Sequence, residues 1–388
     1  MTSAPTLDAQ ELLARARQIT GLDRFDEPSP TEPLTALTQA LQSEAQLTPS
    51  GRDYWSERLL GILITRLRGC ECTRRHPEIL YERIHAPIVI LGLTRTGTTL
   101  LQRLIASDER FYSAAYWEAR FPAPEADDLA GDRRIALAKA EIDAMLAANP
   151  DLMTVHPFDA LDADEDILIL DQTLLSRTAE TLACVPGYYA WLRTQDLRPA
   201  YQYWYRTLQL LQWQKRRRGV SAQRWVLKTP MHLAFVDHIL ELLPDARFVQ
   251  THRDPLTTIP SYASMVHELW LGVSAAADPL EAAKQTSATL EHDLARCLQV
   301  RATLPADTFI DVDFRDTVTD PIGVIERVYA HVGLEMTDLA ARRIRSYMQS
   351  HPREARPEHK YSLAQYGFTE AEIRRRFQAY REKHIERA

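Results

Sequence analysis

A Gly- and Thr-rich turn is the first feature of this chain that suggests chemistry. The stretch VILGLTRTGTTLLQRLI, residues 89–105, begins as an apolar strand and ends as an amphipathic helix. Gly92 and Gly97 have the spacing of a Walker loop, G-x-x-x-x-G-K-[ST], but Thr98 stands in the place of the lysine. The cation of this turn is Arg95. Because a helix N-terminus also offers unpaired N–H groups, we expect the turn to bind an anion of the phosphate type.

The missing lysine disfavours phosphoryl transfer from ATP. Kinases and ATPases use that lysine and a magnesium ion to stabilise charge on the terminal phosphates. A 5′-phosphate without a polyphosphate tail suits this loop better. The backbone of Gly97 and the hydroxyls of Thr98 and Thr99 are available as its contacts.

A second anion site is predicted after the strand ARFVQTH, residues 246–252. Arg253 ends this strand, and Ser261 lies eight residues later, inside the next predicted helix. Eight residues are about two helical turns, so the two side chains can share a face. A guanidinium and a hydroxyl on one face form a site separate from the loop.

Alternating strands and helices are predicted to position these residues. Continuous apolar strands that alternate with helices are typical of a parallel sheet buried on both faces. The predicted strands are 86–93, 224–228, 246–252 and 308–314. We therefore expect an α/β fold with a P-loop-type parallel sheet flanked by helices. Ligands of such sheets bind at the carboxyl ends of the strands, where the loop lies.

The remaining sequence predicts additional helices around this sheet. We expect a helical N-terminal region at 1–85 and an α/β domain at 86–388, with a helical insertion at about 130–220. The Pro-rich segment DEPSPTEP interrupts the N-terminal helices, whose role the sequence leaves open. The aromatic stretch 188–213 suits either an acceptor pocket or core packing, and its periodicity favours the core. The basic run KRRRG, 215–219, is predicted to be the solvated end of a helix.

Composition excludes several classes of protein. The 388 residues are 45% hydrophobic and 26% charged, which is typical of soluble globular proteins. The formal net charge of −7 argues against general nucleic-acid binding. No apolar run reaches the roughly 20 residues of a membrane span, and no secretory signal is recognised. The four cysteines do not form a disulfide framework, so we predict a cytoplasmic protein. The oligomeric state stays open, a homo-oligomer included.

The ordered set of motifs resembles the sulfotransferase family. The set comprises the lysine-less loop GLTRTGTTLLQRL, Lys228 in VLKTP, and the pair Arg253 and Ser261. The order looks most like the bacterial small-molecule sulfotransferases related to the tyrosylprotein sulfotransferases. It covers residues 88–262, with weaker similarity to about residue 368.

The resemblance implies a specific reaction. A sulfuryl group would pass from 3′-phosphoadenosine-5′-phosphosulfate (PAPS) to a hydroxyl of a small molecule, with 3′-phosphoadenosine-5′-phosphate (PAP) as product and no metal. The 5′-phosphosulfate would be held by Arg95, Thr96, Gly97, Thr98 and Thr99. The 3′-phosphate would be held by Arg253 and Ser261, and Lys360 in the tail segment HKYSLAQYGFT is a further candidate. A solvated tail is an equal alternative for Lys360.

In-line displacement at sulfur needs a base for the acceptor hydroxyl and cations for the leaving oxygen. Lys228 and Arg95 are the predicted cations. The favoured base is Glu118 in SAAYWEARFP, because related enzymes place a glutamate in this part of the chain. His156, whose imidazole is a common general base, and Glu165 are the other candidates.

Two other functions remain open from the sequence. One is a P-loop small-molecule kinase, which magnesium dependence would distinguish. The other is a non-catalytic nucleotide-binding module, which would bind nucleotide without turnover. The acceptor itself is not identified by any motif.

Overall fold

A five-stranded parallel sheet forms the centre of the computed structural model, which describes residues 7–125, 130–148, 153, 157–351 and 362–386. Its strand order is β2-β3-β1-β4-β5, and every pairing is parallel. The prediction of an α/β fold with a parallel sheet is therefore confirmed. The strands are β1 (Ile88–Gly92), β2 (Phe111–Tyr112), β3 (Arg224–Lys228), β4 (Arg247–His252) and β5 (Phe309–Asp313).

The central strand β1 is buried on both faces of the sheet. Successive side chains point to opposite faces, and helices cover each face. Ile88 and Ile90 pack into one hydrophobic core, and Val89 and Leu91 pack into the other. The helices that line the first core are α4 (Thr98–Ala106), α16 (Pro321–His331) and α17 (Asp338–Ser350).

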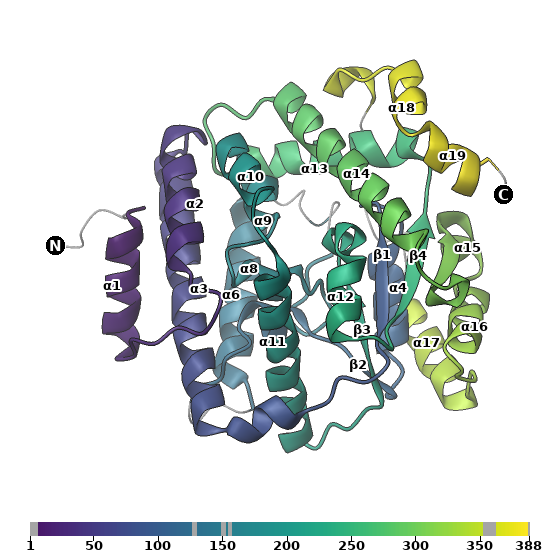
Figure 1. Ribbon diagram of the computed structural model, residues 1–388, viewed down its shortest axis with the longest axis horizontal. Coiled ribbons are helices and arrows are strands. Elements are labelled where there is room, and N and C mark those ends of the chain that lie inside the picture. Colours follow the sequence, from purple (N-terminus) through teal and green to yellow (C-terminus); the bar gives the residue numbers. More distant parts are fainter. Residues whose placement is uncertain (1–6, 126–129, 149–152, 154–156, 352–361, 387–388) are drawn as a thin grey trace.

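The second core extends from the sheet to the N-terminal helices. Leu12 and Leu59 belong to the same buried cluster as Phe248 of β4. Figure 1 shows the N-terminal helices at one end of the molecule and α16 and α17 at the other, with the strands between. The N-terminal region is therefore packed as a helical layer on the main core. The helices of this side are α1 (Ala9–Thr20), α2 (Thr31–Ser43), α3 (Pro49–Arg75), α11 (Arg198–Arg217), α12 (Val236–Leu242), α13 (Pro255–Leu271) and α14 (Pro279–Arg301).

The remaining helices of the described chain fall into two groups. Between β1 and β3 they are α5 (Tyr116–Arg120), α6 (Asp132–Ala148), α8 (Ile167–Asp171), α9 (Thr178–Leu182) and α10 (Pro186–Leu192). Towards the C-terminus they are α15 (Phe314–Thr319), α18 (Glu370–Arg376) and α19 (Gln378–His384). The 3₁₀ turns are η1 (Pro77–Tyr81), η2 (Pro230–Ala234), η3 (Ala306–Thr308) and η5 (Ala364–Tyr366).

Two local predictions differ from the structure. The predicted break DEPSPTEP is shorter than expected, because α2 already begins at Thr31 and accommodates Pro33 in its first turn. The pattern HLAFVDHILELLP, residues 232–244, predicts a helix soon after β3. Instead the chain first forms η2, in which the Thr229 hydroxyl accepts from the Met231 N–H, and α12 begins only at Val236.

The aromatic stretch 188–213 is mainly core. Tyr188, Tyr201, Trp204 and Trp213 are all buried, which confirms the core interpretation. Among the described helices, none is both long and apolar enough for a membrane span.

Candidate active site

The lysine-less loop lies at the carboxyl end of β1 and leads into α4. Gly97 caps α4 with a φ of 85°, and a Cβ there would lie 3.1 Å from the ring of Phe314. At Gly92 a Cβ would lie 2.4 Å from the hydroxyl of Thr251 on β4. The close approach at Gly92 therefore requires glycine, and the left-handed φ of Gly97 favours glycine there. Arg95 has a φ of 70°, a left-handed conformation that costs an ordinary residue roughly 1–2 kcal/mol and that fixes where its side chain begins.

The three threonines of the loop have different surroundings. Thr96 is buried, and its hydroxyl donates to the Leu93 carbonyl (2.7 Å) and bonds Thr251 Oγ1 (2.6 Å). Its side chain therefore supports the loop, and a ligand would meet its backbone. Thr98 opens α4 and is also buried, whereas Thr99 accepts a hydrogen bond from the ammonium of Lys228.

Lys228 joins the loop to a carboxylate. It ends β3, the strand beside β1, and its side chain is fully buried. Its Nζ lies 3.2 Å from Thr99 Oγ1 and 2.7 Å from Glu165 Oε1. The structure thus brings together one predicted cation, one predicted loop contact and one of the three candidate bases.

The helix that follows the loop also holds the segment that carries Glu165. Gln102 Nε2 donates to the carbonyl of Asp164 (2.8 Å), and Arg103 Nε donates to that of Ala163 (3.1 Å). Because both donors lie on α4, one helix positions the N–H groups of the loop and the Glu165 carboxylate. Sequence reasoning missed this function of Gln102 and Arg103. Their signal is two polar residues inside a short apolar helix.

The predicted second anion site meets the loop at Arg95. Arg253 Nη1 donates to the Arg95 carbonyl (3.0 Å), and Arg95 Nε donates to Ser261 Oγ (3.3 Å). The Arg253 guanidinium also lies over the ring of Phe314, 4.0 Å from its centroid. The structure therefore gathers Arg253 and Ser261 beside the loop.

These contacts concentrate positive charge at one edge of the sheet. Arg95, Lys228 and Arg253 surround the N-terminus of α4, whose helix dipole adds a partial positive charge. The chain as a whole has a formal net charge of −7, so this edge is a local exception. Such a cluster attracts a dianion and stabilises negative charge that develops there.

Glu118 lies in a different ion cluster. Its Oε2 accepts from Lys215 Nζ (2.5 Å) and from the Ala115 N–H (3.1 Å), and its Oε1 accepts from Arg218 Nη2 (2.5 Å). Burial alone would raise the pKa of this carboxyl, but the two cations hold the pKa below its usual value.

The run 215–219 was predicted to be the solvated end of a helix. It does end α11, and Arg216 and Arg217 are exposed as predicted. Lys215 and Arg218 differ, because the buried carboxylate of Glu118 binds both of them.

The two candidate carboxylates have different cation partners. Lys215 lies in the last turn of α11, and Arg218 is the C-cap of that helix. Glu118 accepts from these two cations, whereas Glu165 accepts from Lys228, whose ammonium also donates to Thr99 of the loop. The other two predicted site residues, His156 and Lys360, lie outside the described residues.

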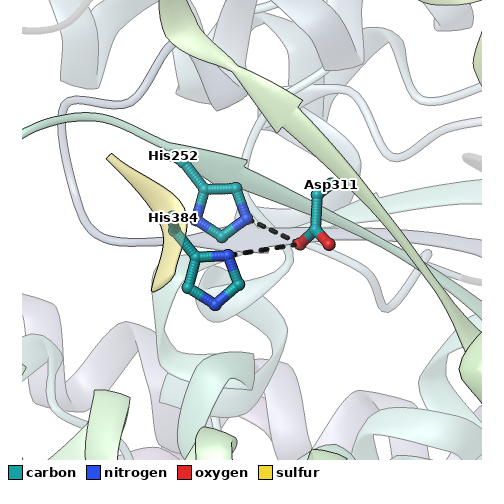
Figure 2. A group of neighbouring side chains, drawn as sticks. All are labelled: His252, Asp311 and His384. Carbon is teal, nitrogen blue, oxygen red and sulfur yellow. Dashed lines mark hydrogen bonds and ion pairs between the residues drawn. The ribbon is translucent and has the colours of Figure 1, made fainter. Parts of the chain in front are cut away.

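A hydrogen-bonded group beside Arg253 fixes the end of β4. Figure 2 shows His252, Asp311 and His384 facing one another. His252 Nε2 donates to Asp311 Oδ1 (2.7 Å), and the two imidazole rings stack with centroids 4.3 Å apart. Among the described residues this is the one group of His, Cys, Asp and Glu close enough to bind a metal ion. However, Arg301 donates to both oxygens of Asp311, so its positive charge opposes a cation there. We interpret the group as a clamp that attaches the C-terminal helix α19 to the sheet.

Comparison with known proteins decides the class of this site. The model of the sulfotransferase family matches residues 87–338, which include the loop, Lys228, Arg253 and Ser261. The chain belongs to the sulfotransferase family. The protein is thus an enzyme of sulfuryl transfer, and the predicted family and function class are confirmed.

Related mycobacterial sulfotransferases share the fold and most of the chain. The solved structure of STF1 from Mycobacterium tuberculosis is 32% identical with a TM-score of 0.83, over 97% of this chain and 100% of that one. STF9 from Mycobacterium avium is 26% identical with a TM-score of 0.87, over 99% of this chain and 98% of that one. The omega-hydroxy-beta-dihydromenaquinone-9 sulfotransferase Stf3 of Mycobacterium tuberculosis and Mycobacterium bovis is 28% identical over 282 residues, 68% of this chain and 67% of Stf3.

Proposed function

We propose that this sulfotransferase takes its sulfuryl group from PAPS and transfers it to a hydroxyl of a small molecule. The observation that carries the proposal is the contact of two anion sites at Arg95. The lysine-less loop suits a 5′-phosphosulfate, and Arg253 with Ser261 suits a 3′-phosphate. PAPS carries both groups on one nucleotide, and it supplies an activated sulfuryl group with PAP as the leaving group.

The residues of this chain fit such a donor. The N–H groups at the start of α4 and the Arg95 guanidinium provide directed donors for the phosphosulfate. The loop lacks the Walker lysine because its ligand has no γ-phosphate. Arg253 is kept in place from two sides, by the Arg95 carbonyl and by the ring of Phe314. A guanidinium that stacks on an aromatic face still points its N–H donors outward in the plane of the group, where they can bind an anion.

Lys228 and Arg95 supply the positive charge that the reaction needs. Negative charge grows on the oxygen that leaves sulfur, and fixed cations in a site that excludes water stabilise it strongly. Lys228 is suited to this role because its side chain is fully buried and its ammonium reaches the first turn of α4.

We propose Glu165 as the base that accepts the proton of the acceptor hydroxyl. Its carboxylate is bound to Lys228, which places it at the loop, and its side chain is 22% exposed, so a hydroxyl can reach it. Glu118 is 3% exposed, and Lys215 and Arg218 engage its two oxygens. Its exposure and its contact with Lys228 therefore favour Glu165 over Glu118.

We further propose that the acceptor is an alcohol on a largely apolar molecule. The support is the name of the relative Stf3, which describes a sulfotransferase for an omega-hydroxylated dihydromenaquinone. At 28% identity this support extends to the class of acceptor and not to that one compound.

Calorimetric titration tests the proposed donor. We expect PAP to bind tightly without metal, and ATP with magnesium to bind far more weakly. Absence of PAP binding, or a preference for ATP with magnesium, would overturn the proposal. Transfer of ³⁵S-labelled sulfate from PAPS to a panel of phenols, primary alcohols and omega-hydroxylated prenyl quinones then tests the acceptor class.

A further inference from the structure

A buried carboxylate next to Glu165 binds the end of β3. Asp166 Oδ1 accepts the backbone N–H of Lys228 (2.7 Å). In the opposite direction the backbone N–H of Asp166 donates to the Lys228 carbonyl (3.2 Å). This pair of hydrogen bonds joins the backbone of Lys228 to the segment that contains Glu165.

The second oxygen of Asp166 belongs to a chain of buried polar groups. Its Oδ2 accepts from Trp204 Nε1 and from His232 Nε2, each at 2.7 Å. The other ring nitrogen of His232 lies 3.0 Å from the Tyr201 hydroxyl. Because an ionised carboxylate only accepts, His232 donates through Nε2, and its Nδ1 shares the other hydrogen bond with the Tyr201 hydroxyl. Trp204, His232 and Tyr201 are fully buried, and Asp166 is 1% exposed.

The charge of Asp166 is maintained in spite of its burial. Burial by itself would raise the pKa of the carboxyl, but the neighbouring His232 and the N–H donors of Trp204 and Lys228 keep that pKa below its usual value. A buried carboxylate whose two oxygens both accept hydrogen bonds is held rigidly. Breaking any of these bonds would leave a buried polar group without a partner, which costs free energy.

The position of Asp166 in the chain indicates more than a local structural role. It directly precedes α8, where an aspartate normally stabilises the helix by accepting from its first N–H groups. Here the side chain makes no such bond to α8 and turns to the end of β3 instead. His232 follows Lys228 by four residues in the motif LKTPMH. The network therefore includes residues from the two segments that supply Lys228 and Glu165, and its far end is Tyr201 on α11.

We propose that Asp166, His232 and Tyr201 form a positioning network that fixes Lys228 and Glu165 relative to each other for sulfuryl transfer. The 2.7 Å contact between Lys228 Nζ and Glu165 Oε1 depends on where the two backbones lie. Asp166 determines that separation directly, and His232 and Tyr201 fix the orientation of Asp166. This inference rests on the proposed function of Glu165 as base.

Three variants with matched chemistry test the network. Asp166→Asn keeps the shape of the side chain but removes its negative charge. It also leaves one acceptor oxygen in place of two. Tyr201→Phe removes only the hydroxyl at the far end. The control is Trp225→Phe, which removes an equally buried indole N–H whose partner is Gln212 (2.9 Å) and which lies on the same strand as Lys228.

We expect Asp166→Asn to lower kcat by about 10- to 100-fold, because small misplacements of reacting groups have effects of this size. Its Kd for PAP should change by less than about threefold, since the loop and Arg253 are intact. A general structural defect would instead weaken PAP binding and lower kcat together. Tyr201→Phe should lower kcat by about 3- to 10-fold, and the control should leave it unchanged.

Hydrogen exchange gives a readout that needs no turnover. In Asp166→Asn, the peptides 164–168 and 226–230 should exchange faster together, while the Trp225→Phe control leaves peptide 164–168 unchanged. Wild-type kcat in both Asp166→Asn and Tyr201→Phe, or exchange that stays at the wild-type rate, would overturn the network. If Asp166→Asn does not fold, Tyr201→Phe decides by the same measurements. Failure of the proposed function is seen separately, as a wild-type protein that does not bind PAP.

Discussion

Replacement of Arg253 by alanine is expected to weaken the binding of PAP far more than that of adenosine 5′-phosphate, which lacks the 3′-phosphate. A hydrogen bond between charged partners contributes about 1.5–3 kcal/mol. At 1.4 kcal/mol for each tenfold change, the loss for the 3′-phosphate is about 10- to 150-fold in Kd.

The structure predicts that part of the effect is shared by both nucleotides. Arg253 also donates to the carbonyl of Arg95 at 3.0 Å, and loss of such a bond within the loop costs about 1 kcal/mol, or about fivefold. This shared loss weakens both ligands, because both use the loop. The ratio of the two losses therefore isolates the 3′-phosphate and should remain about 10- to 150-fold.

Calorimetric titration of both nucleotides into wild type and variant measures this ratio. Arg247→Ala is the matched control, because Arg247 begins β4 at the amino edge of the sheet and Arg253 follows its carboxyl end. The control should leave both Kd values unchanged. Equal losses for PAP and adenosine 5′-phosphate in Arg253→Ala would refute the 3′-phosphate site.

The remaining predictions concern the base, the loop and the C-terminal clamp. Glu165→Gln should lower kcat by about 10²- to 10⁴-fold while PAP binding stays intact. Glu118→Gln should mainly lower the thermal midpoint, because it leaves buried cations with a neutral partner. The reverse pattern would assign the role of base to Glu118. Gly97→Ala should destabilise the protein by about 1–3 kcal/mol and weaken the binding of PAP, because alanine is strained at a φ of 85°. The control Gly61→Ala lies inside α3, where a Cβ has open space, and should stabilise the protein by about 0.5–1 kcal/mol. Burial and the neighbouring His252 lower the pKa of His384 to about 4, so the unfolded chain takes up this proton first and stability should fall as the pH drops from about 6.5 to about 4. A His384→Phe variant whose thermal midpoint falls as steeply as that of wild type across this range would contradict the clamp.

Much of the candidate site was predictable because its signals are local. The two glycines of the loop, Arg95 and the helix start lie within one stretch of a few residues, and their spacing alone predicts an anion site. Lys228 and Arg253 follow predicted strands, and parallel strands bring their carboxyl ends to one edge of the sheet. The structure gathers these residues as the strand pattern predicts. Thr96 is the exception, since the direction of a hydroxyl depends on its neighbour Thr251 across the sheet.

The sequence by itself determined the fold class, the lysine-less loop and the residues at the strand ends, because hydrophobic periodicity and turn chemistry act over a few residues. The tertiary structure decided which carboxylate lies at the loop. Glu118 meets Lys215 across 97 residues of chain, and Glu165 meets Lys228 across 63. Such pairings depend on how helices pack against the sheet, so no local pattern in either segment predicts them. For the same reason the sequence did not predict the contact between Asp166 and His232. These residues are 66 positions apart in the chain, and Asp166 Oδ2 lies 2.7 Å from His232 Nε2.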